Sequence, residues 1–180
     1  MTQTLILYSS VHGHTHKVCQ RVAERLHALG ELVTIAALDR APSLSTFDKV
    51  VVGASIRHGK HNADVYAFVA QHQPVLDKKL TGFFSVSLVA RKAAKNTPET
   101  NPYMQAFLAK TSWQPKVLSV FAGKLNYQGY SRMDRNIIRF IMWLTNGPTE
   151  PNTNVEYTDW KKVDEFAYSL FSLNGQASGR

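Results

Sequence analysis

The turn after the first apolar run of the chain carries residue types that can bind an anion. Leu5-Ile6-Leu7 is typical of a buried strand, and a turn around Gly13 follows, directly before a helical pattern. A strand, a short turn and a helix N-terminus direct several backbone N–H groups to one point, where the helix dipole also favours negative charge. The hydroxyl side chains of this turn add donors without adding charge. The pattern predicts a phosphate monoester site formed by Ser9, Ser10, Val11, His12, Gly13, His14 and Thr15.

A metal site is the competing interpretation of the same turn, because His12, His14 and His16 stand at alternate positions. Zinc sites usually complete their ligand set with cysteine, carboxylate or further histidine. No carboxylate lies near these three, and Cys19 is on the apolar side of the helical pattern, where it is expected in the core. We therefore predict no metal. The motifs G-x-G-x-x-G and G-x-x-x-x-G-K-[ST] are both absent, which argues against a Rossmann NAD site and against nucleoside triphosphate hydrolysis.

The elements that must position this turn alternate between strand and helix. Apolar, β-rich segments are expected as strands at 4–8, 32–37, 49–54, 82–88 and 117–122. Helices are expected from Thr15 to Leu29, from Asn62 to a stop before Pro74, after an N-cap at Thr97 with Pro98 in the first turn, and from Thr158 to Leu173. Apolar runs such as Val50-Val51-Val52 suit parallel strands covered on both faces. The chain is therefore predicted to form a doubly wound α/β sheet.

Ligands of doubly wound sheets bind beyond the carboxyl ends of the strands. Two further loops reach that edge, at 53–62 and at 85–96. We expect them to flank a flat ring, with backbone amides and hydroxyls at its polar edge and Ile56 or Leu88 against its faces. Solvated loop charges are the alternative interpretation of the cations in these loops. The predicted ring contacts are Ser55, Ile56, Arg57, Gly59, Ser87, Leu88, Val89 and Ala90.

A long segment after the fifth strand exceeds what the fold requires. Residues 123–157 occupy a connection for which about 2 to 6 residues would suffice. Within this segment, a helix is predicted over residues 132–145. Ser131 and Asp134 have the spacing of a capping box at its start, and Asn146-Gly147-Pro148 is a strong stop signal at its end. Arg132, Arg135, Asn136 and Arg139 share one narrow face of this helix, and apolar side chains cover most of the rest. Such a basic amphipathic helix suits an anionic membrane surface or a substrate lid, while packing on the protein core is the plainer alternative.

The length of the chain limits the number of domains, and its charge indicates the kind of partner. The 180 residues fit one domain, 1–180, and the single cysteine, Cys19, is expected in the core. Between Lys78 and Arg139 there are 11 Lys and Arg against only Glu99 and Asp134, a local net charge of +9 within a total of +8. This concentration predicts an anionic partner. The N-terminus enters a strand without a basic region or cleavage site, so we expect the chain to stay in the cytoplasm.

Several motifs together resemble a known family. The spacing from Ser10 to Thr15 resembles the loop of flavodoxins for the phosphate of FMN, with His12 where those proteins usually have threonine. "VVGASIRHG" (51–59), "SVSLVARK" (85–92) followed by "TPETN" (97–101), and "YTDW" (157–160) narrow the resemblance to the bacterial quinone-dependent protoporphyrinogen IX dehydrogenases. The resemblance spans 4–173. It implies a flavodoxin-like, five-stranded parallel sheet in the order 2-1-3-4-5, with a long insertion after strand five.

The resemblance also implies an activity. This is the FMN-dependent removal of six electrons from protoporphyrinogen IX, which gives protoporphyrin IX in haem biosynthesis with menaquinone or ubiquinone as acceptor. The enzyme would sit peripherally on the cytoplasmic side of the bacterial inner membrane. No catalytic side chain is assigned, because the chemistry takes place at the flavin. The substrate carries two propionates, and the cations that could pair with them are Arg57, Arg91, Lys92, Arg132, Arg135 and Arg139.

The sequence alone leaves two other functions open. A flavodoxin-like NAD(P)H:quinone oxidoreductase would use the same FMN loop with a nicotinamide donor, and a flavodoxin-type electron carrier would have no substrate of its own. Electron carriers of this kind are typically acidic, whereas this chain is basic. The basic region also lacks a recognisable nucleic-acid-reading motif, so we predict no nucleic-acid partner. Self-association into a homo-oligomer is left open.

Overall fold

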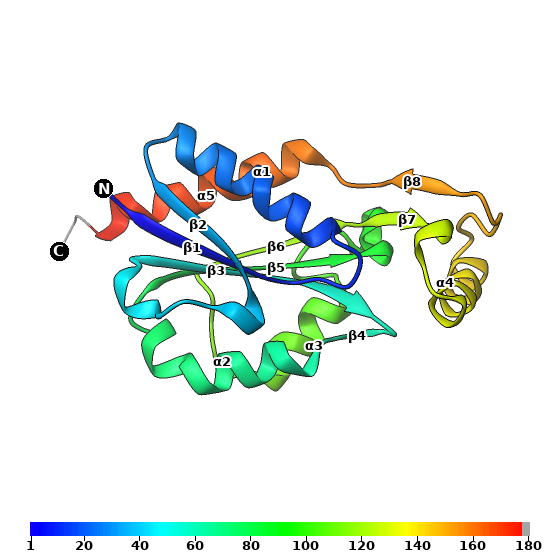
Figure 1. Ribbon diagram of the computed structural model, residues 1–180, viewed down its shortest axis with the longest axis horizontal. Coiled ribbons are helices and arrows are strands. Elements are labelled where there is room, and N and C mark those ends of the chain that lie inside the picture. Colours follow the sequence, from blue (N-terminus) through cyan, green and yellow to red (C-terminus); the bar gives the residue numbers. More distant parts are fainter. Residues whose placement is uncertain (178–180) are drawn as a thin grey trace.

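A five-stranded parallel sheet forms the centre of the computed structural model, which describes residues 1–177 (Figure 1). Residues 178–180, the end of the predicted domain, lie outside the described residues. The strands β1 (Gln3–Ser9), β2 (Leu32–Ala37), β3 (Lys49–Arg57), β5 (Leu80–Ser87) and β6 (Val117–Ala122) follow the order β2-β1-β3-β5-β6. Every neighbouring pair in this order is parallel. The predicted doubly wound sheet and its order 2-1-3-4-5 are confirmed.

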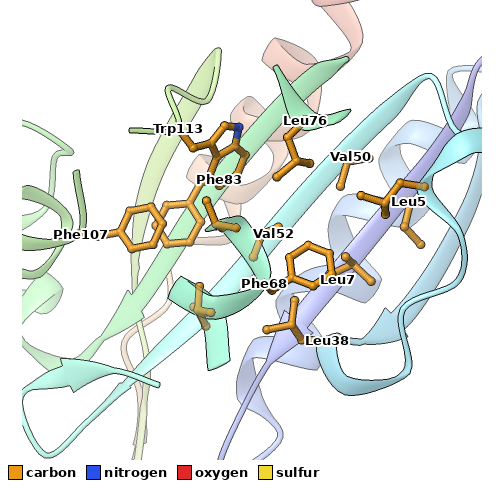
Figure 2. Close-up of a cluster of buried hydrophobic side chains, with 14 of the residues drawn as sticks. Leu5, Leu7, Leu38, Val50, Val52, Phe68, Leu76, Phe83, Phe107 and Trp113 are labelled. Atoms are coloured by element: carbon orange, nitrogen blue, oxygen red, sulfur yellow. The ribbon is translucent and has the colours of Figure 1, made fainter. Parts of the chain in front are cut away.

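Helices cover both faces of the sheet, which explains why its strands are apolar without alternation. α1 (His14–Ala28) and α5 (Trp160–Ala177) lie on one face, and α2 (Ala63–Leu76) and α3 (Pro102–Lys110) lie on the other (Figure 1). Under α1 and α5, Cys19 is buried beside Val22 and Phe166, so its predicted place in the core is confirmed. On the α2 and α3 side, Phe83 and Phe107 stack with ring centroids 4.1 Å apart (Figure 2).

Three predicted helix boundaries are wrong. α5 does not stop at Leu173 but continues through Asn174 and Gly175 to Ala177. α2 begins after Asn62 as expected, but it continues through Pro74 to Leu76. The proline removes only one N–H near the C-terminal end, and Leu76 is fully buried, so packing outweighs the loss. α3 starts at Pro102 instead of Pro98, because the buried Asn101 side chain accepts hydrogen bonds from the N–H groups of Tyr103 and Met104 at 3.1 Å each. Thr97 instead closes a local turn with Thr100.

The insertion forms a small structure of its own beyond the carboxyl ends of the strands (Figure 1). β7 (Lys124–Asn126) pairs antiparallel with β8 (Asn154–Glu156), and the 3-10 turn η5 (Tyr127–Gly129) leads from β7 into α4 (Arg132–Leu144). The predicted helix 132–145 is therefore present, with Thr145 as its C-cap. A short strand, β4 (Lys60–His61), folds back and pairs antiparallel with the end of β3.

Short 3-10 segments complete the chain. They are η1 (Leu38–Arg40), η2 (Leu44–Thr46), η3 (Leu88–Arg91) and η4 (Ala93–Lys95). η3 directly follows β5 and so lies at the carboxyl edge of the sheet, where the predicted ring-contact loop was placed. None of the helices within residues 1–177 is both long and apolar enough to span a membrane.

Candidate active site

A cleft opens where the carboxyl ends of the central strands meet the insertion. It encloses about 870 Å³, counting the part open to solvent. The turn after β1, the turn between β3 and β4, and η3 form its sheet side, and α4 forms its outer wall. The lining residues that the sequence pattern had indicated are Ser10, Val11, His12, His14, Thr15, Ser55, Ile56, Arg57, Ser87, Leu88, Val89 and Gly59.

The turn after β1 leaves the first N–H groups of α1 available to a ligand. Gly13 is the N-cap with a left-handed backbone (φ +83°), and no side chain caps this helix. The first turn of α1 contains no acidic residue. A Cβ added at Gly13 would meet no atom within 4 Å, so the space beside the turn is open. Because the first N–H groups of a helix have no partner within it, this turn is built to bind an anion.

The three histidines of the turn point to different partners. The His12 ring packs against Tyr130 with centroids 4.6 Å apart, and the His16 ring stacks on Tyr8, also at 4.6 Å. The Nε2 of His14 lies 2.7 Å from the hydroxyl of Thr158, and that hydroxyl donates to the Ala122 carbonyl. Burial lowers the pKa of His14, which favours a neutral ring. Within residues 1–177, no group of three or more His, Cys, Asp or Glu could hold a metal ion.

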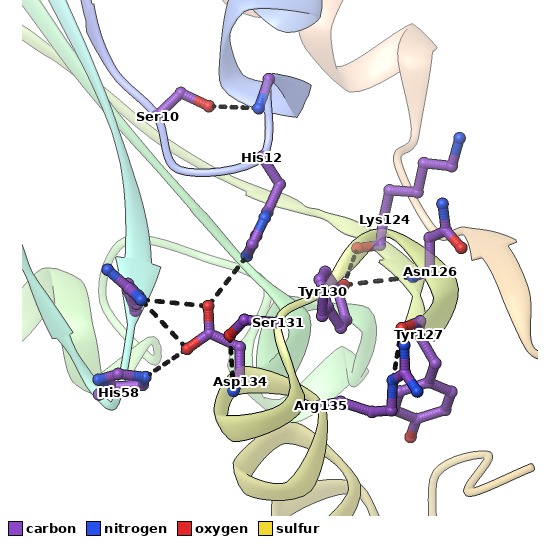
Figure 3. A network of polar contacts seen from close by, with 12 residues as sticks. Ser10, His12, His58, Lys124, Asn126, Tyr127, Tyr130, Ser131, Asp134 and Arg135 are labelled. Carbon is purple, nitrogen blue, oxygen red and sulfur yellow. Dashed lines mark hydrogen bonds and ion pairs between the residues drawn. The ribbon is translucent and has the colours of Figure 1, made fainter. Parts of the chain in front are cut away.

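A buried carboxylate joins the insertion to the sheet side of the cleft (Figure 3). Asp134 of α4 is 3% exposed and lies 2.7 Å from the Nε2 of His58. The Nη2 of Arg57 contacts the same carboxylate at 3.2 Å, and the Nε2 of His12 lies 3.8 Å from it. The hydrogen bond from His58, followed by the contact with Arg57, lowers the pKa of Asp134. We call Asp134, His58, Arg57 and His12 the Asp134 cluster.

The inner face of α4 is fixed to the rest of the protein. Met142 is fully buried and packs with Leu125, Tyr127 and Tyr130 of the insertion itself, and Leu88 of η3 packs against this cluster from the sheet side. Arg91 reaches the C-terminal end of the helix, where its Nη2 donates to the Thr145 hydroxyl at 2.9 Å. Ile137, Ile138 and Ile141 line the cleft from the same side. α4 therefore supplies the cleft with an apolar wall as well as a carboxylate.

Comparison with known proteins shows the family to which the chain belongs. The flavodoxin domain family matches residues 5–152. The chain is 39% identical to the protoporphyrinogen IX dehydrogenase [quinone] of Escherichia coli K12 over 95% of this chain and 96% of that protein. It is 40% identical to the protein of the same name from Leishmania major, over 94% of this chain and 74% of that one. The chain belongs to this flavodoxin-domain dehydrogenase family.

Solved structures agree on the fold. Flavodoxin 2 from Bacillus cereus superposes with a TM-score of 0.52 at 13% identity, covering 95% of this chain and 99% of that one. At this identity the likeness concerns the fold alone. The flavodoxin-like fold predicted from the sequence is thus confirmed.

The cleft of this family member fits FMN, the cofactor of its fold. The Gly13 turn suits the phosphate, and Ile56 and Leu88 line the space where a ring would lie. The hydroxyl oxygen of Ser87, at the carboxyl end of β5, is buried and has no hydrogen-bond partner among the described residues. An unpaired buried hydroxyl is unfavourable, and the polar edge of a flavin would satisfy it.

Several predicted residues lie outside the cleft lining. Ser9 ends β1, and its carbonyl accepts a hydrogen bond from Ser55 at 3.5 Å. Gly13 acts through its backbone, and Ala90 is buried within η3. Other residues line the cleft although the sequence pattern did not indicate them as site residues. These are His58, Val86, Tyr103, Gly123, Lys124, Tyr130, Asp134, Ile137, Ile138 and Ile141.

The cations predicted to pair with propionates have different surroundings. Arg57 contacts Asp134, and Arg91 bonds to Leu88 and Thr145. Arg135 and Arg139 donate to the carbonyls of Tyr127 and Thr149 at 2.9 and 3.0 Å. Of the six, only Arg57 lines the cleft. The side chains of Lys92 and Arg132 make no hydrogen bond or ion pair with any described residue, so these two side chains are free to meet an anionic group.

Proposed function

We propose that the protein oxidises protoporphyrinogen IX to protoporphyrin IX with FMN as cofactor and a quinone, menaquinone or ubiquinone, as electron acceptor. The observation that carries this proposal is the 39% identity over 95% of the chain with the E. coli dehydrogenase. The cleft supports it, because the phosphate turn and an apolar wall face one shared space.

The residues of the chain bind and orient while the cofactor supplies the redox chemistry. FMN, when bound, accepts a hydride and passes two electrons on. The Gly13 turn would hold its phosphate, and Ser87 would meet its ring. Ile137, Ile138 and Ile141 would keep water from the reacting carbon, because these side chains cover one side of the cleft.

We also propose a peripheral position on the cytoplasmic side of the inner membrane, and the outer face of α4 supports contact with a membrane. Met133, Phe140, Trp143 and Leu144 are 61%, 59%, 67% and 59% exposed. Exposed apolar side chains of this size gathered on one helix mark an interaction surface. The free Arg132 borders this face, and each basic residue near an anionic bilayer contributes about 1 kcal/mol. A quinone dissolved in the bilayer would then be close to the cleft, since the inner face of the same helix lines it.

The decisive experiment measures cofactor uptake and turnover. The purified protein is expected to bind FMN and, without oxygen, to convert protoporphyrinogen IX into fluorescent protoporphyrin IX only when quinone is added. Replacing quinone and substrate by NADPH should leave the flavin oxidised. Protein that takes up no FMN, or that forms no porphyrin under these conditions, contradicts the proposal.

Matched glycine variants test the phosphate turn. Gly13 and Gly30 both have a left-handed backbone with open space around them, at opposite ends of α1. Gly13→Ala and Gly30→Ala should therefore each lose about 1 kcal/mol of stability. Only Gly13→Ala should weaken FMN binding, by about ten-fold or more in a fluorescence titration. Equal FMN affinity in the two variants would place the phosphate elsewhere.

A further inference from the structure

The Asp134 cluster gathers side chains from three separate parts of the chain in one cleft. His12 comes from the phosphate turn, Arg57 and His58 from the end of β3 and the turn that follows it, and Asp134 from the insertion. Asp134 is the only carboxylate in the cleft lining of the described chain. Arg91 joins the C-terminal end of α4 to η3, whereas Asp134 joins the N-terminal end of α4 to the sheet side of the cleft.

The ring of His58 is oriented by one hydrogen bond, and its other nitrogen is available to accept a proton. Its Nε2 lies 2.7 Å from Asp134, so this nitrogen carries the hydrogen and donates it to the ionised carboxylate. Its Nδ1 has no partner among the described residues, and the side chain is 35% exposed. The backbone of His58 is left-handed, with φ +52°. Such strain in a residue other than glycine persists where the surroundings hold it, and it is frequent at functional sites.

The proposed reaction needs a group that His58 can supply. Across the three two-electron steps the substrate loses three hydrides from methylene carbons and three protons, of which two come from pyrrole nitrogens and one from the remaining methylene carbon. When a pyrrole nitrogen loses its proton, the N–H electron pair forms the new C=N double bond as the hydride leaves the neighbouring carbon. A bound flavin would supply the hydride acceptor, and the proton needs a separate acceptor. Reduction of the quinone to quinol then consumes one hydride and one proton.

We propose that His58 accepts the pyrrole proton on its Nδ1 and that Asp134 positions the ring through Nε2. This inference rests on the proposed function. The proton then passes from His58 to the quinone, directly or through solvent. In each step, one hydride and one proton leave the substrate, and one quinone receives both. Other titratable or charged groups line the same cleft: His12 and His14 of the phosphate turn, Arg57 of β3, Tyr103 of α3, and Lys124 and Tyr130 of the insertion.

Variants at the two positions separate proton transfer from folding. His58→Asn keeps a residue type that tolerates a left-handed backbone, so this variant should fold. Asp134→Asn removes the charge and keeps the backbone N–H that donates to Ser131. His27→Asn is the matched control, because His27 is exposed on α1 away from the cleft.

The anaerobic porphyrin assay should show that His58→Asn lowers kcat by about 100-fold or more, the range of a general base, with KM little changed. A general base produces an acid limb in the pH profile of kcat/KM, and this limb should be present in the wild type and absent in His58→Asn. A second readout does not use turnover. Nitrogen NMR of the full-length chain without FMN should show the His58 hydrogen on Nε2 in the wild type and a mixture of tautomers in Asp134→Asn. His27→Asn should match the wild type in both.

The outcomes distinguish this inference from the proposed function. An active wild type with an equally active His58→Asn, or a His58 hydrogen found on Nδ1, overturns the role of His58 alone. A wild type that forms no porphyrin overturns the proposed function, and the role of His58 falls with it. The tautomer measurement still decides in that case whether Asp134 orients the ring.

Discussion

Asp134 shows what local spacing can and cannot reveal about a residue. The sequence places it three residues after Ser131, and its backbone N–H does donate to the Ser131 hydroxyl at 3.2 Å. Its carboxylate turns instead toward Arg57 and His58, which are 77 and 76 positions away. A capping box involves residues within one helical turn, so the sequence alone can predict it. A contact between the insertion and a distant strand end depends on how these two parts pack together, so the sequence alone cannot predict it.

Histidine burial makes stability depend on pH. His61 of β4 is 2% exposed, packs edge-on against Phe83 and Phe107, and has its Nε2 2.8 Å from the Ser85 hydroxyl. Burial lowers its pKa to about 4, whereas the unfolded chain has the ordinary value of about 6.5. The neutral ring thus stabilises the fold above about pH 6.5, and this contribution is lost as the pH falls toward 4.

Urea unfolding at pH 7 and pH 5 measures this loss. The wild type should lose about 2 kcal/mol more over this interval than His61→Gln, which keeps a hydrogen-bonding group but does not titrate. His27→Gln, at an exposed position, should lose as much as the wild type. A wild type and a His61→Gln variant with equal pH dependence would contradict the prediction.

Helices and strands that have a clear local sequence pattern could be predicted. Those whose existence or boundaries depend on packing against distant parts of the chain could not. β2 and β6 were predicted with the bounds that the structure has, because each is a short β-rich run between clear breaks. The continuation of α2 through Pro74 required knowing that Leu76 is buried. β7 and β8 are three residues each and carry no alternation that a sequence pattern could detect.

The contact between β3 and the turn before β2 includes a buried ion pair that a mutational cycle can test. Lys49, fully buried, donates to Glu31 at 2.6 Å, and Glu31 also accepts from Thr4 and Asn174. Burial lowers the pKa of Lys49 despite the pair. Glu31→Gln leaves a buried ammonium without its counter-ion and should reduce the free energy of unfolding by about 3 kcal/mol.

The double variant Glu31→Gln/Lys49→Met removes both charges and should recover most of that loss in the same urea titration. A double variant no more stable than Glu31→Gln would show that Glu31 stabilises the protein through its other partners, Thr4 and Asn174, and not through Lys49.

On the scale of the whole molecule, α4 has two faces with different environments. Ile137, Ile138, Ile141 and Met142 face the cleft and the core, which accounts for only part of the apolar surface of the helix. The sequence indicated an amphipathic helix but left lipid, substrate and core as alternatives. The structure divides the apolar residues between an inner face and an exposed face, and a sequence pattern alone cannot make this division because both faces are apolar.

Vesicle flotation tests whether the exposed face meets a membrane. Phe140→Ser/Trp143→Ser removes two side chains that are 59% and 67% exposed, so folding should be unaffected. We expect binding to phosphatidylglycerol vesicles to weaken by about ten-fold or more, since each aromatic side chain loses more than 1 kcal/mol of burial in the bilayer interface. Neutral phosphatidylcholine vesicles and added salt should weaken binding of the wild type as well, because the neighbouring arginines act through charge.

The matched control is Val75→Ser/Tyr168→Ser, which removes two exposed apolar side chains from α2 and α5. Equal flotation of the two double variants would show that α4 is not the contact surface. Loss of flotation that accompanies a change from dimer to monomer in size-exclusion chromatography would assign the face to a homo-oligomer. Turnover separates these cases further, since a membrane role predicts that Phe140→Ser/Trp143→Ser slows oxidation with vesicle-bound long-chain quinone and leaves oxidation with a water-soluble quinone unchanged.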